Sequence, residues 1–407
     1  MKLTVVGRVL LVTSLFLGFG GCDDDDKNNN LVQPGFDIDL MVSNLEAALD
    51  GAVMGYAFSV ARDGNHYASR SGGYARHPLD YPLDTTNGIA MSPTMRVNVA
   101  SVSKVVGAVA LMRVLQEKGI SPLTPIHNHL PPSWKPLVHA DHFDAGSQYK
   151  VDFRKLMRME TGIQYPGSSV SPGAMSSNAQ MLSALQISAD PSRWGAYQNG
   201  NYCLIRVLIG EIEFDLDETD VNYAQNCADA YVQFINDKLF NPIGVSNVLG
   251  TYLDRYPPMS YESASIVGHT KDTCTGYFGL AASDGTINNS GSGGLRLSSM
   301  GIANFLAYFM HAPDQMGVDV DTRDYILDHY LGFTSTPSYD SPAHGSTPYY
   351  AKAGAFTAFD GTCVQAGRAH RSCSMVFAET GVEVGLILNS PGSVCNEIRD
   401  AYDAAWH

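Results

Sequence analysis

The residues best suited to chemistry are a serine and a lysine three positions apart, in Ser101-Val102-Ser103-Lys104. A helix places residues three apart on the same face, so the Ser101 hydroxyl and the Lys104 amine can meet. Serine is a weak nucleophile until a base takes its proton, and a lysine whose pKa is lowered by burial can be that base. The pair therefore predicts nucleophilic catalysis, with Ser101 attacking and Lys104 moving the proton.

A second copy of the same spacing shows how little the motif means alone. Ser147-Gln148-Tyr149-Lys150 has it too, and a chain of this length is expected to hold about one or two such matches by chance. Residues 105–115 are long and apolar enough for a buried helix, whereas the second copy lies in a polar stretch that contains glycine. Because burial is what activates a lysine, the context favours Ser101 and predicts a loop at Ser147.

A serine–lysine pair also needs a group that relays protons. Tyr197-Gln198-Asn199 comes just before an apolar helical run, and Ser176-Ser177-Asn178 lies among Ser, Pro and Gly residues. A tyrosine can take or give a proton if neighbouring lysines lower its pKa. We favour Tyr197, and the alternative at that position is an ordinary core tyrosine before a helix.

The reaction needs, in addition, donors that stabilise an oxyanion. Lys352-Ala353-Gly354-Ala355 lies on a predicted strand near the end of the chain. Gly354 would let a substrate backbone come close, and the amide of Ala355 could form an oxyanion hole with the amide of Ser101. Taken alone, Lys352 is more typical of a surface lysine at the start of a strand.

In this order and in these contexts, the three motifs resemble those of class C β-lactamases and D-alanyl-D-alanine peptidases. Three further segments resemble stretches of the same family, namely residues 156–163, 239–244 and 292–298. The resemblance runs from about residue 36 to the C-terminus. It implies a serine hydrolase that forms an acyl-enzyme on Ser101, with Lys104 and Tyr197 moving protons. It also implies that Asn199 holds an acyl-side amide and that Lys352 attracts a substrate carboxylate.

The sequence departs from the family's pattern after the lysine of the third motif. Ala353 stands where the family has a threonine or serine whose hydroxyl binds a β-lactam carboxylate, and residues 356–359 are bulkier than usual. Both departures weaken antibiotic hydrolysis as the function, so the bond attacked could be a peptide, amide, ester or β-lactam bond. The alternative is a binding or sensor lipoprotein that kept the fold and lost turnover; a zinc hydrolase is more remote.

The pattern of apolar residues predicts strands at both ends of the chain and helices between them. Helices are expected at 36–49, 201–212, 223–240, 298–309 and 394–406, and strands at 55–61, 66–71, 349–354, 374–379 and 383–389. This arrangement predicts an α+β fold (an α/β sandwich). An antiparallel sheet built from both termini would be flanked by helices, with an all-α region inserted at about 122–290. The resemblance implies a β-lactamase/transpeptidase-like version of it.

The first residues are typical of an export signal. Lys2 and Arg8 precede the apolar residues 9–17, and Phe19-Gly20-Gly21-Cys22 is similar to the lipobox of bacterial lipoproteins. We expect a signal peptide at 1–21, a lipid on Cys22, an acidic tether at 22–35 and a hydrolase domain at 36–407. The protein would then be anchored to a membrane in the periplasm or at the cell surface. An ordinary cleaved signal is the alternative.

Composition limits the partners and the redox state. The formal net charge of −15 excludes phosphate-backbone binding as a favoured function, so we expect a small-molecule or peptide substrate with a carboxylate and no nucleic acid. Six cysteines besides Cys22 in an exported chain suggest disulfides, with fifteen possible connectivities. Short separations favour 203–227 and 363–373, which leaves 274–395. No cysteine pair has zinc-site spacing, and the histidines at 127, 129, 139 and 142 lie in a loop-like stretch, so no metal or other cofactor is expected.

Overall fold

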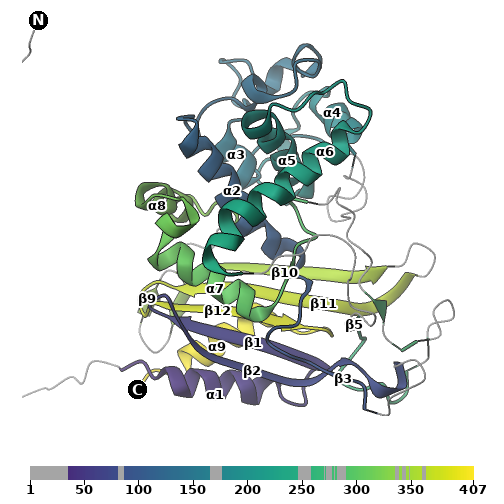
Figure 1. Cartoon of the computed structure of the whole chain (residues 1–407), viewed down its shortest axis with the longest axis vertical. Helices are drawn as coiled ribbons and strands as arrows, with labels where there is room; N and C mark the ends of the chain where they lie inside the picture. Colours follow the sequence, from purple (N-terminus) through teal and green to yellow (C-terminus); the bar gives the residue numbers. More distant parts are fainter. Residues whose placement is uncertain are drawn as a thin grey trace, which may run out of the picture. The chain divides into compact units, whose positions relative to one another are not determined.

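Two segments from opposite ends of the chain meet in one six-stranded antiparallel sheet in the computed structural model (Figure 1). The strand order is β10-β11-β12-β1-β2-β3, so β10 is an edge strand. The strands are β1 (Gly55–Arg62), β2 (Asn65–Arg76), β3 (Ile89–Ala90), β10 (Tyr349–Phe359), β11 (Val364–Phe377) and β12 (Val382–Leu388). The structure describes residues 35–80, 87–165, 177–245, 258–269, 271, 277–278, 280–281, 290–334, 339–341, 345–347, 349–359 and 364–407.

Local sequence explains the central pairing. β1 and β2 are joined by Asp63 and Gly64, which both have positive φ (50° and 80°), as the tight turn of a hairpin requires. β1 then pairs on its other side with β12, in the register Ala57 to Ile387. The strand that opens the domain thus lies beside one of the strands that close it.

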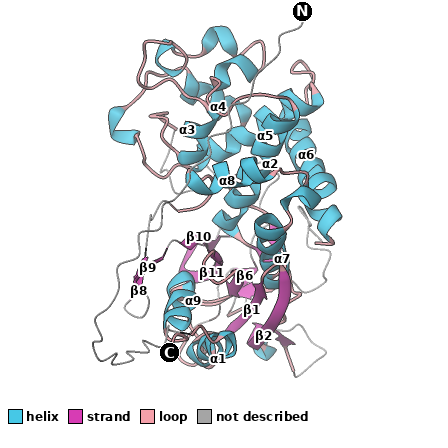
Figure 2. Ribbon diagram, turned by 90° about the vertical axis from the view of Figure 1, so that its left-hand side faces the viewer, coloured by secondary structure: helices cyan, strands magenta, loops and turns pink. Residues whose placement is uncertain are grey.

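Helices cover both faces of the sheet. α1 (Ile38–Leu49) and α9 (Val394–Asp403) lie on one face, and α7 (Ser299–His311) packs on β1 and β12 from the other (Figures 1 and 2). α1 begins at Asp37, whose carboxylate accepts from the Leu40 amide at 3.0 Å as a helix cap. One apolar cluster lies between α1, α9 and the sheet, and includes Met41, Leu45 and Phe58.

A larger apolar cluster joins α7 and the sheet to a group of helices beyond them (Figure 2). α2 (Ser103–Glu117) lies inside this group, and every residue from Ser103 to Leu115 is buried. It packs against α5 (Asn199–Phe214) and α8 (Val320–Asp328). The other helices of the group are α3 (Phe153–Arg158), α4 (Asn178–Leu185) and α6 (Tyr223–Phe234), which continues as a π-helical turn over Ile235–Phe240.

Short strand pairs complete the described structure. β4 (Val97–Asn98) pairs with β7 (Arg296–Leu297), and β5 (Met259–Ser260) pairs with β6 (Leu280–Ala281). β8 (Tyr339–Ser341) pairs with β9 (Gly345–Thr347). The predicted α+β fold with an antiparallel sheet from both termini is confirmed. The helical part also includes α2 and α8, which lie outside residues 122–290, because α2 packs on α5 and α8 packs on α2.

The expected cysteine pairing is wrong. Cys373 on β11 bonds to Cys395 on α9, across 5.4 Å between Cα atoms. Cys203 and Cys227 are free and buried, because their thiols face different neighbours: Cys203 lies 3.3 Å from the Ser292 hydroxyl, and Cys227 lies against Asn178 and Gly210. Pairing followed the contact of β11 with α9, which separation along the chain does not reveal. The other two predicted partners, at positions 274 and 363, lie outside the described residues.

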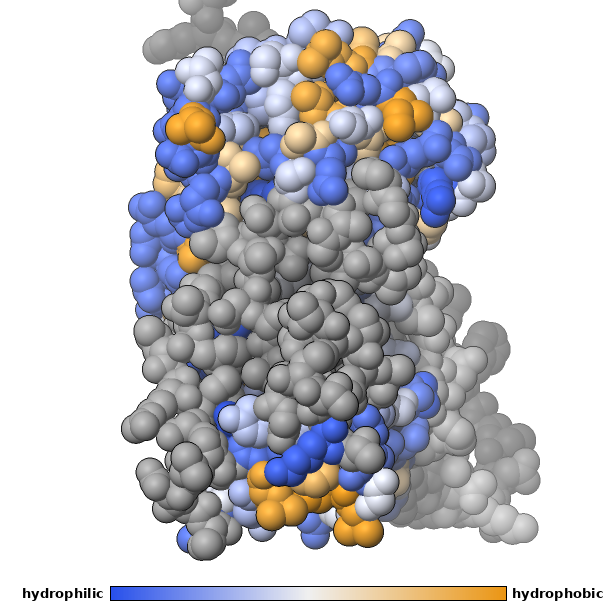
Figure 3. Space-filling model, turned by 90° about the vertical axis from the view of Figure 1, so that its right-hand side faces the viewer, coloured by the Kyte–Doolittle hydropathy of each residue, from blue (hydrophilic) through white to orange (hydrophobic). Residues whose placement is uncertain are grey.

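The expected export segment, with Cys22, also lies outside the described residues. Among those that are described, no helix is both long and apolar enough to cross a bilayer. On the face seen in Figure 3, the helical part of the molecule is largely polar, with apolar residues scattered among the polar ones.

Candidate active site

Ser101 sits in a short turn that the surrounding backbone holds from two sides. The 3-10 turn Ala100–Val102 runs directly into α2. Ala100 has a φ of +46°, a backbone region that residues other than glycine rarely adopt. Its amide donates to the Asn98 side-chain oxygen at 2.9 Å. Such strain persists only where neighbouring structure fixes the chain. Here Asn98 lies in the β4–β7 pair, so the serine is presented from a fixed support.

Lys104 lies one helical turn from Ser101, with its Nζ 3.0 Å from the Ser101 Oγ. Its side chain is fully buried and also donates to the carbonyl of Ser292. Burial lowers the pKa of Lys104 well below the usual lysine value, and the nearby Lys352 lowers it further. A lysine buried in this way loses its proton at a lower pH than a surface lysine does, and its neutral amine can then accept a proton.

Tyr197 approaches the same hydroxyl from the other side, with its Oη 2.6 Å from the Ser101 Oγ. Its ring lies 5.1 Å from the Lys104 Nζ and 5.0 Å from the Lys352 Nζ. The expectation that these lysines lower the pKa of Tyr197 is wrong: burial raises it, and the hydrogen bond with Ser101 only partly opposes that effect. Because Lys104 is itself driven toward its neutral form, it offers little charge to stabilise a phenolate.

β10 brings the third motif against the serine turn. Lys352 is buried, and burial lowers its pKa to about 8. A Cβ on Gly354 would lie 2.3 Å from the Val99 carbonyl oxygen and 3.3 Å from the Ser101 amide nitrogen, so only glycine fits there. Ser372, opposite Gly354 on β11, donates to the Val99 carbonyl at 2.7 Å and fixes the same contact.

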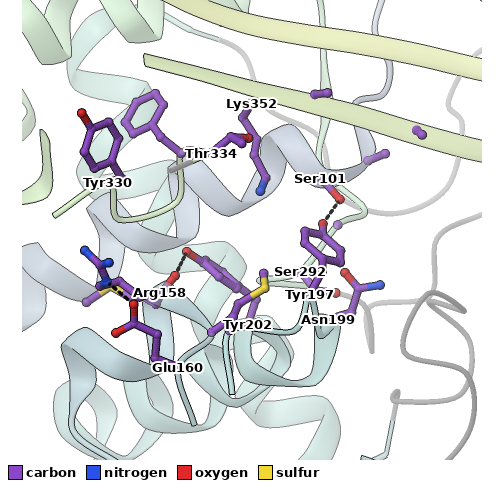
Figure 4. Close-up of a pocket in the computed structure, with 18 of the residues that line it drawn as sticks. Ser101, Arg158, Glu160, Tyr197, Asn199, Tyr202, Ser292, Tyr330, Thr334 and Lys352 are labelled. Atoms are coloured by element: carbon purple, nitrogen blue, oxygen red, sulfur yellow. Dashed lines mark hydrogen bonds and ion pairs between the residues drawn. The ribbon is translucent and has the colours of Figure 1, made fainter. Parts of the chain in front are cut away.

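Of these groups, Ser101, Tyr197 and Lys352 line one end of a cavity of about 500 Å³, a size suited to a small ligand (Figure 4). Asn199 and Ala355 line it as well, so every residue that the sequence singled out around Ser101 borders the cavity or supports its wall. Its other end is formed by residues that the sequence did not single out as a site, among them Arg158, Glu160 and Tyr330.

The family-like segment at residues 156–163, with Thr161 and Gly162, positions the start of α5. The Thr161 hydroxyl donates to the Asn201 side-chain oxygen at 3.0 Å, and the Tyr165 hydroxyl donates to the same oxygen at 3.2 Å. A Cβ on Gly200 would collide with the Tyr165 ring at 2.4 Å. These contacts fix the first turn of α5 and therefore the placement of Asn199.

The two rival motifs have structural roles. Ser147 lies in a series of turns, where its hydroxyl accepts from the Tyr149 amide at 3.1 Å. In the other rival, position 176 lies outside the described residues, while Ser177 caps α4 in a capping box. Asn178 follows it on α4, 3.4 Å from the Arg206 guanidinium, and neither residue borders the cavity.

Sequence reasoning missed several groups that hold the site together. The Ser292 carbonyl accepts from Lys104, and Asn98 and Ser372 fix the turn around Ser101. The serine alternation at 372 and 374, opposite Gly354 and Lys352, is the one sequence signal for this contact. A backbone carbonyl leaves no such signal. The bulky residues 356–359 continue β10, but their side chains lie outside the described part.

Nothing in the described part of the chain forms a metal centre, since no three His, Cys, Asp or Glu side chains gather there as ligands. The histidines that the sequence set aside have other contacts. His142, for example, is buried and hydrogen-bonds the Ile187 carbonyl at 2.9 Å.

A family model described as Beta-lactamase matches residues 39–404. The chain belongs to the β-lactamase family. No functionally curated protein matches it significantly. It is similar in structure to the octameric penicillin-binding protein homologue from Pyrococcus abyssi (TM-score 0.61, 15% identity), covering 90% of this chain and 76% of that one.

Two other solved structures share the fold. One is the D-amino acid amidase from Ochrobactrum anthropi SV3, complexed with L-phenylalanine amide (TM-score 0.54, 16% identity, 90% of this chain and 97% of that one). The other is a class C β-lactamase from Rhodobacter sphaeroides (TM-score 0.55, 14% identity, 90% and 98%). At such identities the likeness establishes the fold and leaves the substrate open.

Proposed function

We propose that the protein is an exported serine hydrolase that works through an acyl-enzyme on Ser101. The observation that carries the proposal is one hydroxyl with two partners. The Ser101 Oγ lies 2.6 Å from the Tyr197 Oη and 3.0 Å from the Nζ of the buried Lys104. Membership in the β-lactamase family supports the same reaction class.

In the acylation step, the neutral Lys104 amine takes the proton of Ser101 while the Oγ bonds to the substrate's carbonyl carbon. The amides of Ser101 and Ala355 hold the resulting oxyanion. When the bond to the leaving group breaks, Tyr197 gives that group a proton and recovers one from Lys104. The raised pKa of Tyr197 suits this role, because a relay needs a tyrosine that starts protonated.

Water completes the cycle by attacking the acyl carbonyl. The same pair takes the water's proton and returns one to Ser101, and the acid product leaves. Asn199 would hold an amide of the acyl group, while Lys352 would attract a carboxylate on the substrate. Within the described residues Lys352 forms no ion pair with an acidic side chain, and the Tyr197 ring lies 5.0 Å from its Nζ, so its charge is available to a ligand.

The bond is a peptide, amide, ester or β-lactam bond. Wild type and Ser101→Ala should be compared on nitrocefin, on short peptides ending in D-Ala-D-Ala and on p-nitrophenyl esters. We expect turnover of at least one class and its loss in Ser101→Ala. A binding or sensor protein would instead keep a stable adduct or bind without turnover. Full activity in Ser101→Ala would overturn the proposal.

For location, we propose that a lipid on Cys22 anchors the mature protein to a membrane facing the periplasm or the cell surface. The support is the lipobox-like Phe19-Gly20-Gly21-Cys22 behind an apolar run. Metabolic labelling with an alkyne fatty acid should tag the wild type and not Cys22→Ser. An untagged wild type with a free N-terminus elsewhere would contradict the anchor.

A further inference from the structure

The cavity has a second polar end, formed by Arg158 and Glu160 (Figure 4). The Arg158 Nε donates to the Glu160 Oε1 at 2.8 Å, and the Arg158 Nη1 donates to the His329 carbonyl at 3.2 Å. The guanidinium is thus fixed from two sides and holds the carboxylate in place. The two side chains are 31% and 27% exposed, so a ligand in the cavity can reach them.

The wall between the two polar ends is apolar and aromatic. Tyr202 is buried, and its hydroxyl donates to the Met157 carbonyl at 2.7 Å, which leaves its ring as the part that lines the cavity. Figure 4 shows Tyr202 between Glu160 and Tyr197 in that view. Met159 and Phe333 line the cavity as well. Such a wall suits a carbon chain that joins two polar groups.

We propose that this second end binds an ammonium group of the substrate, with Glu160 as its counter-ion. The inference rests on the proposed function, because it assigns specificity to the same cavity. Glu160 uses only Oε1 within the described structure, and a carboxylate can accept several further hydrogen bonds. Two of the three guanidinium nitrogens of Arg158 donate to protein acceptors, so Arg158 acts as a positioning residue for the Glu160 carboxylate.

The charges at the two ends support this assignment. Lys352 offers a cation beside Ser101, and at the opposite end the Glu160 carboxylate, paired through its Oε1 with Arg158, has its Oε2 available to a ligand. A substrate with a carboxylate near the scissile bond and an ammonium at the end of an apolar arm matches both. The substrate class is therefore an amino-terminated acyl compound, such as an amino acid or short peptide derivative.

Matched fluorophosphonates test the inference without knowledge of the natural bond. In each, the Ser101 Oγ bonds to phosphorus, fluoride leaves, and the serine proton passes to Lys104. Probes of equal chain length would end in ammonium, methyl or carboxylate, at several lengths. We expect the ammonium probe to label wild type about fivefold faster than the methyl probe at one length or more, as for a partly exposed ion pair.

The variant Glu160→Gln should bring that ratio close to one. Glu218→Gln is the matched control, because Glu218 accepts from the Ser133 amide at 3.0 Å outside the cavity, and it should keep the wild-type ratio. Equal rates for ammonium and methyl at every length, or a faster carboxylate probe, would overturn the inference. So would an equal loss on all probes in Glu160→Gln, which indicates a purely structural role. No labelling by any probe would instead overturn the proposed function, and this inference with it.

Discussion

The chain carries the same serine–lysine spacing twice, and the structure gives the two copies different surroundings. Lys104 is enclosed in the core of the helical part and contacts Ser101 at 3.0 Å. Ser147 and Lys150 lie in consecutive turns, linked by a backbone hydrogen bond from the Lys150 amide to the Ser147 carbonyl at 3.2 Å. Spacing brings a serine and a lysine together only where a helix follows, and burial changes the proton affinity of the lysine.

The comparison teaches that the apolar residues after the motif carry the functional information. Every residue of α2 from Ser103 to Leu115 is buried, so the Lys104 side chain is enclosed by packed residues and meets the cavity only through its contact with Ser101. The second copy has no such helix behind it. Matched substitutions in the two regions should therefore have very different effects. Three such pairs and one pH dependence sharpen or break the comparison.

The largest effect is expected at the two lysines. Lys104→Met keeps a long apolar stem in the core and removes the base, so kcat/KM should fall about 10³-fold. Lys150→Met should stay within twofold of wild type. Steady-state kinetics on the best substrate measures both, with circular dichroism to verify folding. Comparable losses in the two variants would break the comparison.

A smaller effect is expected at the tyrosines of the two regions. Tyr197→Phe keeps the ring between the two lysines and removes the hydroxyl that lies 2.6 Å from Ser101, so kcat should fall about 10²-fold. Tyr149→Phe is the control and should leave kcat unchanged. If Tyr197→Phe retained full kcat, Lys104 alone would suffice as the proton carrier.

The third effect concerns backbone packing. A Cβ on Gly354 would lie 2.2 Å from the Ser372 Oγ and 2.3 Å from the Val99 carbonyl, so Gly354→Ala should lower the free energy of unfolding by about 2 kcal/mol. Gly146, beside Ser147, has its nearest neighbour at 3.7 Å, and Gly146→Ala should change that energy by less than about 0.5 kcal/mol. Urea unfolding gives both values. Equal stability of the two variants would mean that β10 does not need its close approach to Ser101.

The smallest effect is a pH dependence from the lysines at the site. Lys352 loses its charge as pH rises through about 8, so kcat/KM for a carboxylate substrate should fall about tenfold per pH unit above that value. Lys104 has a lowered pKa and acts as a neutral base, so activity should also fall as pH drops through that pKa.

Two controls identify the group whose titration lowers kcat/KM at high pH, the alkaline limb of the pH profile. Lys352→Arg should move it beyond the accessible range, because a guanidinium keeps its proton. A neutral ester should lack this limb in the wild type. An alkaline limb that persists for both would assign it to a group other than Lys352.

The sequence predicted the architecture and the nucleophile because both depend on patterns along the chain. Short apolar stretches next to turn residues marked β1 and β12, and the long apolar run marked α2. It could not predict the partners that come from folding across the chain. The carbonyl of Ser292 and the Cys373–Cys395 bond are examples, since neither leaves a local pattern.

The far end of the cavity was missed for a related reason. Arg158 and Glu160 lie within a segment that the sequence analysis used only for its family pattern, and Phe333 follows α8. The segment at the end of α3 and the segment after α8 meet there, so no spacing within one segment predicts the site. The raised pKa of Tyr197 was also out of reach, because it depends on how deeply the hydroxyl is buried.

The most direct test of the account is to locate the covalent adduct. The protein would be treated with an alkyl fluorophosphonate, digested, and mapped by mass spectrometry. We expect one adduct, on the peptide that contains Ser101, none on the peptide that contains Ser147, and none in Lys104→Met on the same time scale. An adduct at another residue, or equal labelling of the two serines, would contradict the claim that burial of Lys104 makes Ser101 the nucleophile.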